Sequence, residues 1–165
     1  MRIKSSARRK DRLIKDSRKD AYIDQITLKD PAICSKCNAV YTNGRWTWKT
    51  TEQTTSKTTC PACRRISDNY PAGYIEIKGN FFQIHSTDIL NLINNTEQLE
   101  KNERPLERII SITEHENKTV ITTTGIHIAR RIGEALNRSY QGNFLFQYAD
   151  GEKSIRVFWE RSTEK

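Results

Sequence analysis

Residues 34–37 read Cys-Ser-Lys-Cys and residues 60–63 read Cys-Pro-Ala-Cys, and no other cysteine occurs in the chain. The two pairs are separated by 22 residues. Each Cys-x-x-Cys turns tightly enough to aim two thiolates at one ion, and this spacing is typical of a zinc ribbon. Soft thiolates in a tetrahedral arrangement suit zinc. The pattern predicts one Zn²⁺ held by Cys34, Cys37, Cys60 and Cys63.

The alternatives for the four cysteines are two disulfides or a redox pair. No βαβ pattern flanks either pair, which argues against a redox motif. Thiols committed to a metal indicate a reducing compartment, and we expect the cytoplasm. Residues 1–19 are basic but lack the apolar core of a secretory signal. With a mean hydropathy of −0.77, no stretch approaches the ~20 apolar residues of a membrane span.

Positive charge is concentrated in the front half of the chain. Residues 1–30 hold 10 lysines and arginines against 5 acids, and residues 31–75 hold 6 against 2. Residues 76–165 hold 12 against 13, within a total of +8. A basic segment (residues 1–75) followed by a nearly neutral one (residues 76–165) predicts that the basic segment binds a polyanion. The alternative is that the basic residues only make the protein more soluble.

Residues 1–30 are expected to be a basic arm, because they contain too few apolar residues to fold alone. The arm is either disordered or a helix that forms on its partner. Its cations would bind phosphates through counterion release. The expected nucleic-acid contacts in the arm are Arg8, Arg9, Lys10, Arg12, Lys15, Arg18 and Lys19.

Residues 31–73 are expected to form the ribbon, with a tight turn at Asn43-Gly44. Arg45, Trp46 and Trp48 follow that turn, and the two indoles share one strand face because their spacing is two. Exposed indoles would stack on unpaired bases, whereas buried ones would form the core of the ribbon itself. Arg64 and Arg65 follow the last cysteine and would offset thiolate charge or extend a basic face.

The pattern of residues 74–165 predicts a compact α+β domain whose elements follow in the order β-α-β-β-α-β-β. The expected strands are 74–77, 107–114, 118–123, 144–148 and 154–159, and the expected helices are 88–102 and 125–140. The first helix carries a stripe of residues at three- and four-residue spacing that we expect to be buried. The stripe consists of Ile89, Leu92, Ile93, Thr96 and Leu99.

The turn at residues 122–125 reads Thr-Thr-Thr-Gly and leads into the second helix. Free N–H groups there would suit a phosphate, and ordinary capping by a threonine is the alternative. Arg130 is four residues from Glu134, so the two can pair. Arg131 and Arg138 are expected to form an uncompensated cationic pair that binds nucleic acid. No Walker A loop occurs, and His85, His115 and His127 lack an acid at catalytic spacing. The sequence therefore predicts no catalytic residues.

Three motifs carry a resemblance over roughly residues 20–161. They are the Gly44–Trp48 hairpin, the run from Cys60 through Ile66 to Tyr70-Pro71-Ala72-Gly73, and Thr122–His127 with Ala129–Ala135. Together they resemble a small bacterial family of zinc-ribbon proteins, some of them labelled ATPase. A more distant similarity is to the N-terminal half of the large-ribosomal-subunit export adaptor named for nonsense-mediated decay. That resemblance implies ribosome binding, although this chain has one cysteine quartet where the adaptor has two.

These observations lead to a non-enzymatic, zinc-binding, ribosome-associated protein of the cytoplasm that binds ribosomal or other structured RNA. The first alternative is a DNA-binding regulator or repair accessory protein. The second is an enzyme acting on a nucleotide or nucleic acid, with the Thr-Thr-Thr-Gly turn as its phosphate seat. No small-molecule substrate is expected.

Overall fold

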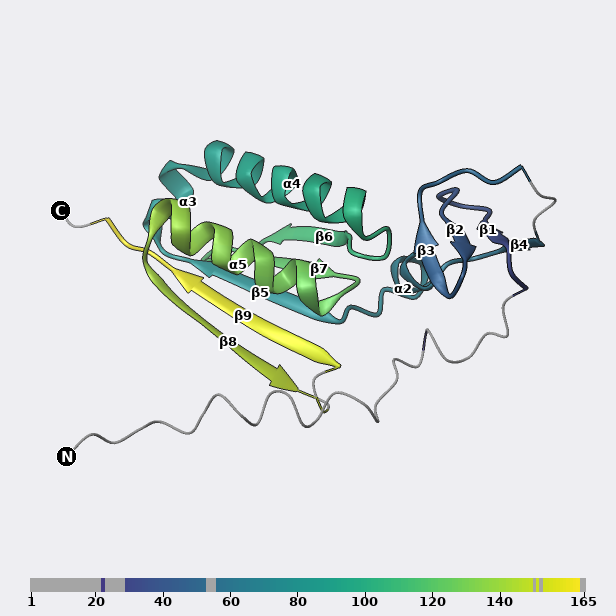
Figure 1. The fold of residues 1–165 in the computed structure, drawn as a ribbon. Coiled ribbons are helices and arrows are strands. Elements are labelled where there is room, and N and C mark those ends of the chain that lie inside the picture. The colour runs from purple at the N-terminus through teal and green to yellow at the C-terminus, as the bar shows by residue number, and fades with distance from the viewer. Residues whose placement is uncertain (1–21, 23–28, 53–55, 150, 152, 164–165) are drawn as a thin grey trace, which may run out of the picture.

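A computed structural model of the chain describes residues 22, 29–52, 56–149, 151 and 153–163. These residues form two β-sheets and four helices, so the expected mixed α+β class is confirmed (Figure 1). The arm cations expected to bind nucleic acid, Arg8, Arg9, Lys10, Arg12, Lys15, Arg18 and Lys19, lie outside the described residues.

The ribbon is built on a four-stranded sheet in the order β3-β2-β1-β4, followed by helix α2. Its elements are β1 (Ala32–Cys34), β2 (Val40–Thr42), β3 (Arg45–Thr47), β4 (Ser56–Thr58) and α2 (Pro61–Asp68). Strands β1 to β3 pair antiparallel, and β4 pairs parallel with β1. The turn between β2 and β3 places Asn43 at φ 53° and Gly44 at φ 78°, a conformation that these two residue types tolerate best.

The second unit is a five-stranded sheet in the order β6-β7-β5-β9-β8. Its elements are β5 (Gly73–Lys78), α3 (Asn80–Ile84), α4 (Ser86–Glu103), β6 (Ile109–Glu114), β7 (Lys118–Thr123), α5 (Ile126–Tyr140), β8 (Asn143–Ala149) and β9 (Ser154–Glu160). Strands β5 and β9 run parallel, and the other neighbours run antiparallel. The expected strands and long helices are all present, with bounds that differ by a few residues.

The short helix α3 is an addition to the expected order. Gly79, at φ 101°, turns the chain out of β5 and directly into this helix. A β-carbon at Gly79 would lie 2.0 Å from the carbonyl oxygen of Arg161. Phe81 and Phe82 are both buried, and their packing on the core holds the extra turn in place.

Helices α4 and α5 lie together on one side of the five-stranded sheet, as Figure 1 shows. The core lies between them and the sheet, because alternate residues of a strand point to the same face. Its fully buried sheet residues are Ile75, Ile77, Ile121, Ile155, Val157 and Trp159. No helix in the described part of the chain combines the length and apolar character that crossing a bilayer requires.

The expectation that Leu99 belongs to the buried stripe of the first long helix is wrong. Ile89 and Ile93 of α4 are buried, but Leu99 is 70% exposed. Residues four apart share a helix face, so the residue that follows Ile93 on the inner face is Glu97. The Glu97 carboxylate accepts a hydrogen bond from the Ile109 N–H group at 2.8 Å. The last turns of α4 therefore present polar rather than apolar residues to the sheet.

The ribbon enters the second unit at Ala72 and Gly73. The N–H group of Ala72 donates to the Thr123 carbonyl, and the Ala72 carbonyl accepts from Ile155 N–H, both at 2.9 Å. A β-carbon at Gly73 would lie 2.2 Å from Thr123 Oγ1 and 2.6 Å from Ala129 Cβ. This close approach admits only glycine and brings the ribbon directly against the end of the sheet.

Candidate metal centre

The four cysteines come from the two ends of the ribbon. Cys34 ends β1, and Cys37 follows in the next turn, where Asn38 takes a left-handed conformation with φ 66°. Cys60 is the N-cap of α2, and Cys63 lies in the first turn of that helix. Pro61 occupies the first helical position, where its missing N–H group costs nothing.

The four sulfur atoms form one compact cluster. All four Sγ atoms lie within 4.8 Å of one another, and the Cys37 and Cys60 Sγ atoms are 3.7 Å apart. A tetrahedron of thiolates with metal–sulfur bonds near 2.3 Å has edges of about 3.8 Å, whereas a disulfide needs about 2.05 Å. All four cysteines are free thiols. The cluster is therefore placed to hold one metal ion, as the sequence predicts.

Backbone donors surround the sulfur atoms. The N–H group of Cys60 points at Cys34 Sγ at 3.3 Å, and that of Cys63 points at Cys60 Sγ at 3.4 Å. Burial alone would raise the pKa of Cys34, but backbone N–H groups, led by that of Cys60, lower it to about 6. Burial raises the pKa values of Cys60 and Cys63.

Arg108 reaches the cluster from the second unit and is the residue that the sequence analysis missed. Its Nη2 atom lies 3.0 Å from Cys37 Sγ and 3.5 Å from Cys60 Sγ, and its Nη1 atom lies 3.3 Å from Cys63 Sγ. Its Nε atom donates to the Pro105 carbonyl at 2.8 Å. Burial alone would lower the pKa of Arg108, but the sulfurs of Cys63 and Cys37 raise it.

The position of Arg108 is fixed by the loop before β6. The Thr124 hydroxyl accepts a hydrogen bond from the Arg108 N–H group at 2.9 Å and donates to the Leu106 carbonyl at 2.6 Å. Leu106 itself packs against the cysteine cluster. Arg108 lies 45 positions from Cys63 and 71 from Cys37. No spacing motif in the sequence connects residues so far apart.

Trp46 and Trp48 pack against the cysteine cluster and are half-buried. The indole N–H group of Trp48 donates a hydrogen bond of 2.7 Å to the carbonyl of Lys101, near the end of α4. The Arg108 guanidinium carbon lies 5.8 Å from the centre of its ring. Trp46 packs beside Tyr41, with ring centres 5.5 Å apart, while Arg45 is exposed. Trp48 thus joins the ribbon to the second unit.

The two arginines after the last cysteine have different surroundings. Arg64 is partly exposed, whereas Arg65 is 5% exposed and donates to the Tyr70 carbonyl at 3.0 Å. The Arg65 guanidinium carbon also lies 4.5 Å from the ring centre of Tyr22, whose hydroxyl donates to Asp68 at 3.0 Å. Arg65 therefore fastens Tyr22 to the ribbon, and Arg64 is the cation here that reaches solvent.

The start of α5 differs from both sequence-based expectations. No side chain at its N-cap, Gly125, makes a capping hydrogen bond. Instead the carboxylate of Glu107, which is 8% exposed, accepts from Ile128 N–H at 3.0 Å. The hydroxyls of Thr123 and Thr124 donate to backbone carbonyls. Because a carboxylate already occupies the helix start, this turn is not a phosphate seat.

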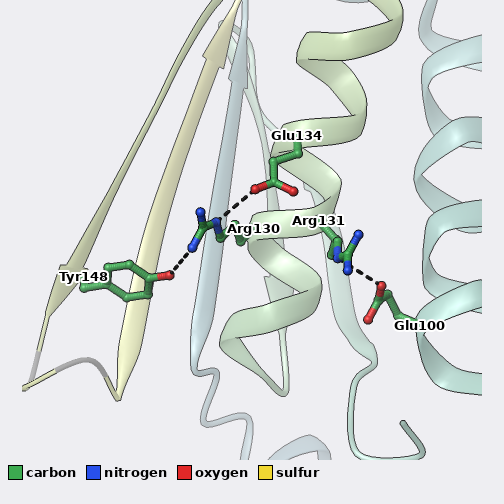
Figure 2. Close-up of polar contacts among 5 residues, drawn as sticks. All are labelled: Glu100, Arg130, Arg131, Glu134 and Tyr148. Atoms are coloured by element: carbon green, nitrogen blue, oxygen red, sulfur yellow. Dashed lines mark hydrogen bonds and ion pairs between the residues drawn. The ribbon is translucent and has the colours of Figure 1, made fainter. Parts of the chain in front are cut away.

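The arginines of α5 also differ from the expected arrangement (Figure 2). Arg130 pairs with Glu134 at 3.0 Å, as expected, and also donates to the Tyr148 hydroxyl at 3.2 Å. Arg131 is not the unpartnered cation that the sequence predicts, because its Nε lies 3.4 Å from Glu100 Oε1 of α4. Two helices that pack side by side supply this pair, which intrahelical spacing does not predict. Arg138 is exposed and makes no ion pair with any described residue.

Comparison with known protein families, with curated proteins and with solved structures finds no match for this chain.

Proposed function

We propose that this chain is a non-enzymatic zinc protein that binds ribosomal or other structured RNA in the cytoplasm through its basic arm and ribbon. Zinc is proposed because four clustered thiolates at tetrahedral spacing suit it, and it needs no redox chemistry. Four protein ligands fill the coordination shell of a tetrahedral zinc ion. No position is then left for a substrate, which is the arrangement of a structural site.

The observation that carries the RNA proposal is the exposure of cations on the ribbon. Lys36, Arg45, Lys49 and Lys57 are all exposed. Residues 31–75 contain only two acids, Glu52 and Asp68. The arm that precedes the ribbon adds ten lysines and arginines against five acids. Such one-signed charge favours a phosphate backbone, with an affinity that depends on salt.

The metal centre supports this function by holding together the ribbon that carries these cations. Arg108, Trp48 and the Ala72 linkage hold the ribbon against the second unit. RNA rather than DNA is proposed because the sequence resembles a family whose members bind the ribosome.

The proposal is tested with the zinc-loaded full chain and with a variant lacking residues 1–19. The deletion removes nine lysines and arginines and two acids. Binding to a fluorescein-labelled single-stranded RNA is measured from 50 to 300 mM salt. The slope of log K against log salt should shrink by ~0.7 for each phosphate that the deleted cations neutralise. An unchanged slope would mean that the arm does not bind phosphate.

Competition and sedimentation separate the remaining functions. An excess of DNA of the same sequence should displace the labelled RNA poorly, and preferential displacement would favour a DNA-binding regulator. In a sucrose gradient of lysate we expect the protein to sediment with ribosomal particles at low salt and to leave them at high salt. A position at the top of the gradient in all salts would contradict ribosome association.

A further inference from the structure

The five-stranded sheet has a second face that no described helix covers. The buried side chains of β5, β7 and β9 point toward α4 and α5, so their neighbours along each strand point the other way. On this open face stand Tyr74 of β5, Val120 of β7 and Phe158 of β9, all half-buried. Two aromatic rings on the solvent side of central strands add nothing to the core on the other face.

The two rings are diagonal neighbours on adjacent strands. Tyr74 is opposite Arg156, and Phe158 is opposite Glu76. Diagonal side chains on paired strands lie roughly 7–8 Å apart, which brings two successive unpaired bases within reach. The guanidinium carbon of Arg156 lies over the face of the Tyr74 ring, 5.1 Å from its centre, so the planar guanidinium and the ring form one stacking surface.

A shallow hollow of about 200 Å³ opens between these side chains. It is lined by Tyr74, Glu76, Lys118, Val120, Arg156 and Phe158. Lys118 Nζ lies 2.7 Å from Glu76 Oε1, and this hydrogen bond holds the pKa of Glu76 below its ordinary value. The hollow therefore combines ring faces with a charged acceptor and charged donors.

Flat rings beside polar groups indicate the chemistry of the occupant. An apolar protein surface would leave Glu76 and Lys118 desolvated without further hydrogen-bonding partners, which is costly. A base offers a ring face to Tyr74 or Phe158 and offers donors and acceptors on its edge. The face also carries Lys78 and Glu160, so three cations stand against two acids. Its net charge therefore complements a phosphate backbone.

The open face begins next to the ribbon. Tyr74 is the second residue of β5, which begins where the ribbon meets the sheet. Figure 1 shows that the starts of β5 and β9 lie at the ribbon end of the sheet. The end of the open face that carries Tyr74 is therefore the end nearest the ribbon.

We propose that Tyr74, Phe158 and Arg156 form a platform for unpaired bases of the same RNA whose phosphates contact the ribbon and arm. This inference rests on the proposed function and names the surface that contacts bases. Structured RNA exposes such bases in loops and bulges. The platform favours single strands over duplexes, because a paired base has no free ring face.

The test uses the zinc-loaded full chain and a fluorescein-labelled 16-nucleotide single-stranded RNA of mixed sequence. Tyr74→Leu and Phe158→Leu keep apolar bulk and remove the rings. Each should weaken binding roughly 5- to 150-fold, the range for removal of one base-stacking ring. The salt slope should stay unchanged, because every cation that binds phosphate is retained. Leu99→Ala is the control and should bind as the wild type does, because Leu99 is exposed on α4, on the opposite side of the sheet.

A second measurement does not depend on a variant folding. RNA containing 4-thiouridine is cross-linked to wild-type protein, and the modified peptides are identified by mass spectrometry. Cross-links to Tyr74 or Phe158 support the platform. Cross-links confined to the ribbon, leucine variants that bind as the wild type does, or equal displacement by duplex RNA would overturn it while leaving the proposed function intact. Absence of any binding by the wild type would overturn both.

Discussion

The Nη2 atom of Arg108 lies 3.0 Å from the Sγ atom of Cys37, although 71 positions separate the two residues in the chain. A guanidinium from the second unit thus neutralises part of the charge of a thiolate cluster in the ribbon. Because the same side chain also reaches Cys60 and Cys63, metal binding and the docking of the ribbon on the sheet are linked.

Replacing Arg108 with Met should weaken metal binding about 10- to 100-fold, as expected for removal of a group that hydrogen-bonds to the ligands. Arg108→Lys should recover only part of this affinity, because one ammonium cannot reach three sulfurs. The measurement is competition for zinc with a chromophoric chelator. Arg64→Met is the control, since Arg64 is next to Cys63 in sequence but its side chain is partly exposed. Equal affinities in all four proteins would contradict the role given to Arg108.

Cys60→Ser should abolish stoichiometric zinc binding and unfold the ribbon. Zinc contributes ~10–16 kcal/mol of apparent binding free energy to small structural sites, and the ribbon has few other buried large side chains. Native mass spectrometry should find one zinc in the wild type and none in the variant. Hydrogen exchange should show reduced protection in β1 to β4 and retained protection in β5, β7 and β9. Protection of the ribbon in the metal-free variant would show that zinc does not hold it folded.

Glu107→Gln should shift the pH dependence of folding stability. Burial raises the pKa of Glu107 above its ordinary value, with Glu100 adding to the rise, while Ile128 N–H and Arg104 oppose it. The folded state therefore favours the neutral acid. The stabilisation that protonated Glu107 gives the folded state is complete at low pH. It is lost as the pH rises from the ordinary carboxyl pKa through the raised pKa of Glu107. The Gln variant keeps an acceptor for Ile128 and should gain stability relative to the wild type across that window.

Urea unfolding at several pH values measures this difference. Glu103→Gln is the matched control, because Glu103 is exposed, and its stability difference from the wild type should stay flat through the same window. A Glu107→Gln variant that becomes less stable relative to the wild type as pH rises would show that the buried carboxylate is stabilising in its charged form.

Arg131→Glu should lower stability, because it places two carboxylates together between α4 and α5. The Arg131 side chain is 57% exposed and that of Glu100 is 13% exposed, so removal of the pair itself costs about 1 kcal/mol or less. Adding Glu100→Arg should restore part of the stability, while Arg138→Glu should change stability by under ~0.5 kcal/mol. Thermal melting of these three variants and of Glu100→Arg alone tests this. Additive effects of Arg131→Glu and Glu100→Arg would mean that the two side chains do not interact.

Motif spacings and relationships within one element could be predicted from the sequence. The cysteine spacing predicts a metal cluster, the Asn43-Gly44 pair predicts its turn, and the three- and four-residue spacing within α4 predicts the burial of Ile89 and Ile93. The pairing of Arg130 with Glu134 follows in the same way, because residues four apart on a helix are neighbours. Turn chemistry and helical periodicity act over a few residues, so the chain itself carries this information.

Relationships between elements required the tertiary structure. Arg108 at the thiolates, Glu107 at the start of α5, Glu100 beside Arg131 and Trp48 on the end of α4 all join segments that lie far apart in sequence. Sequence patterns miss or misplace each of them, because an arginine or glutamate has the same local preferences whether its partner is water or a buried group. Packing of the ribbon and α4 against the sheet decides which charges are brought together, and with them the surroundings of the metal centre.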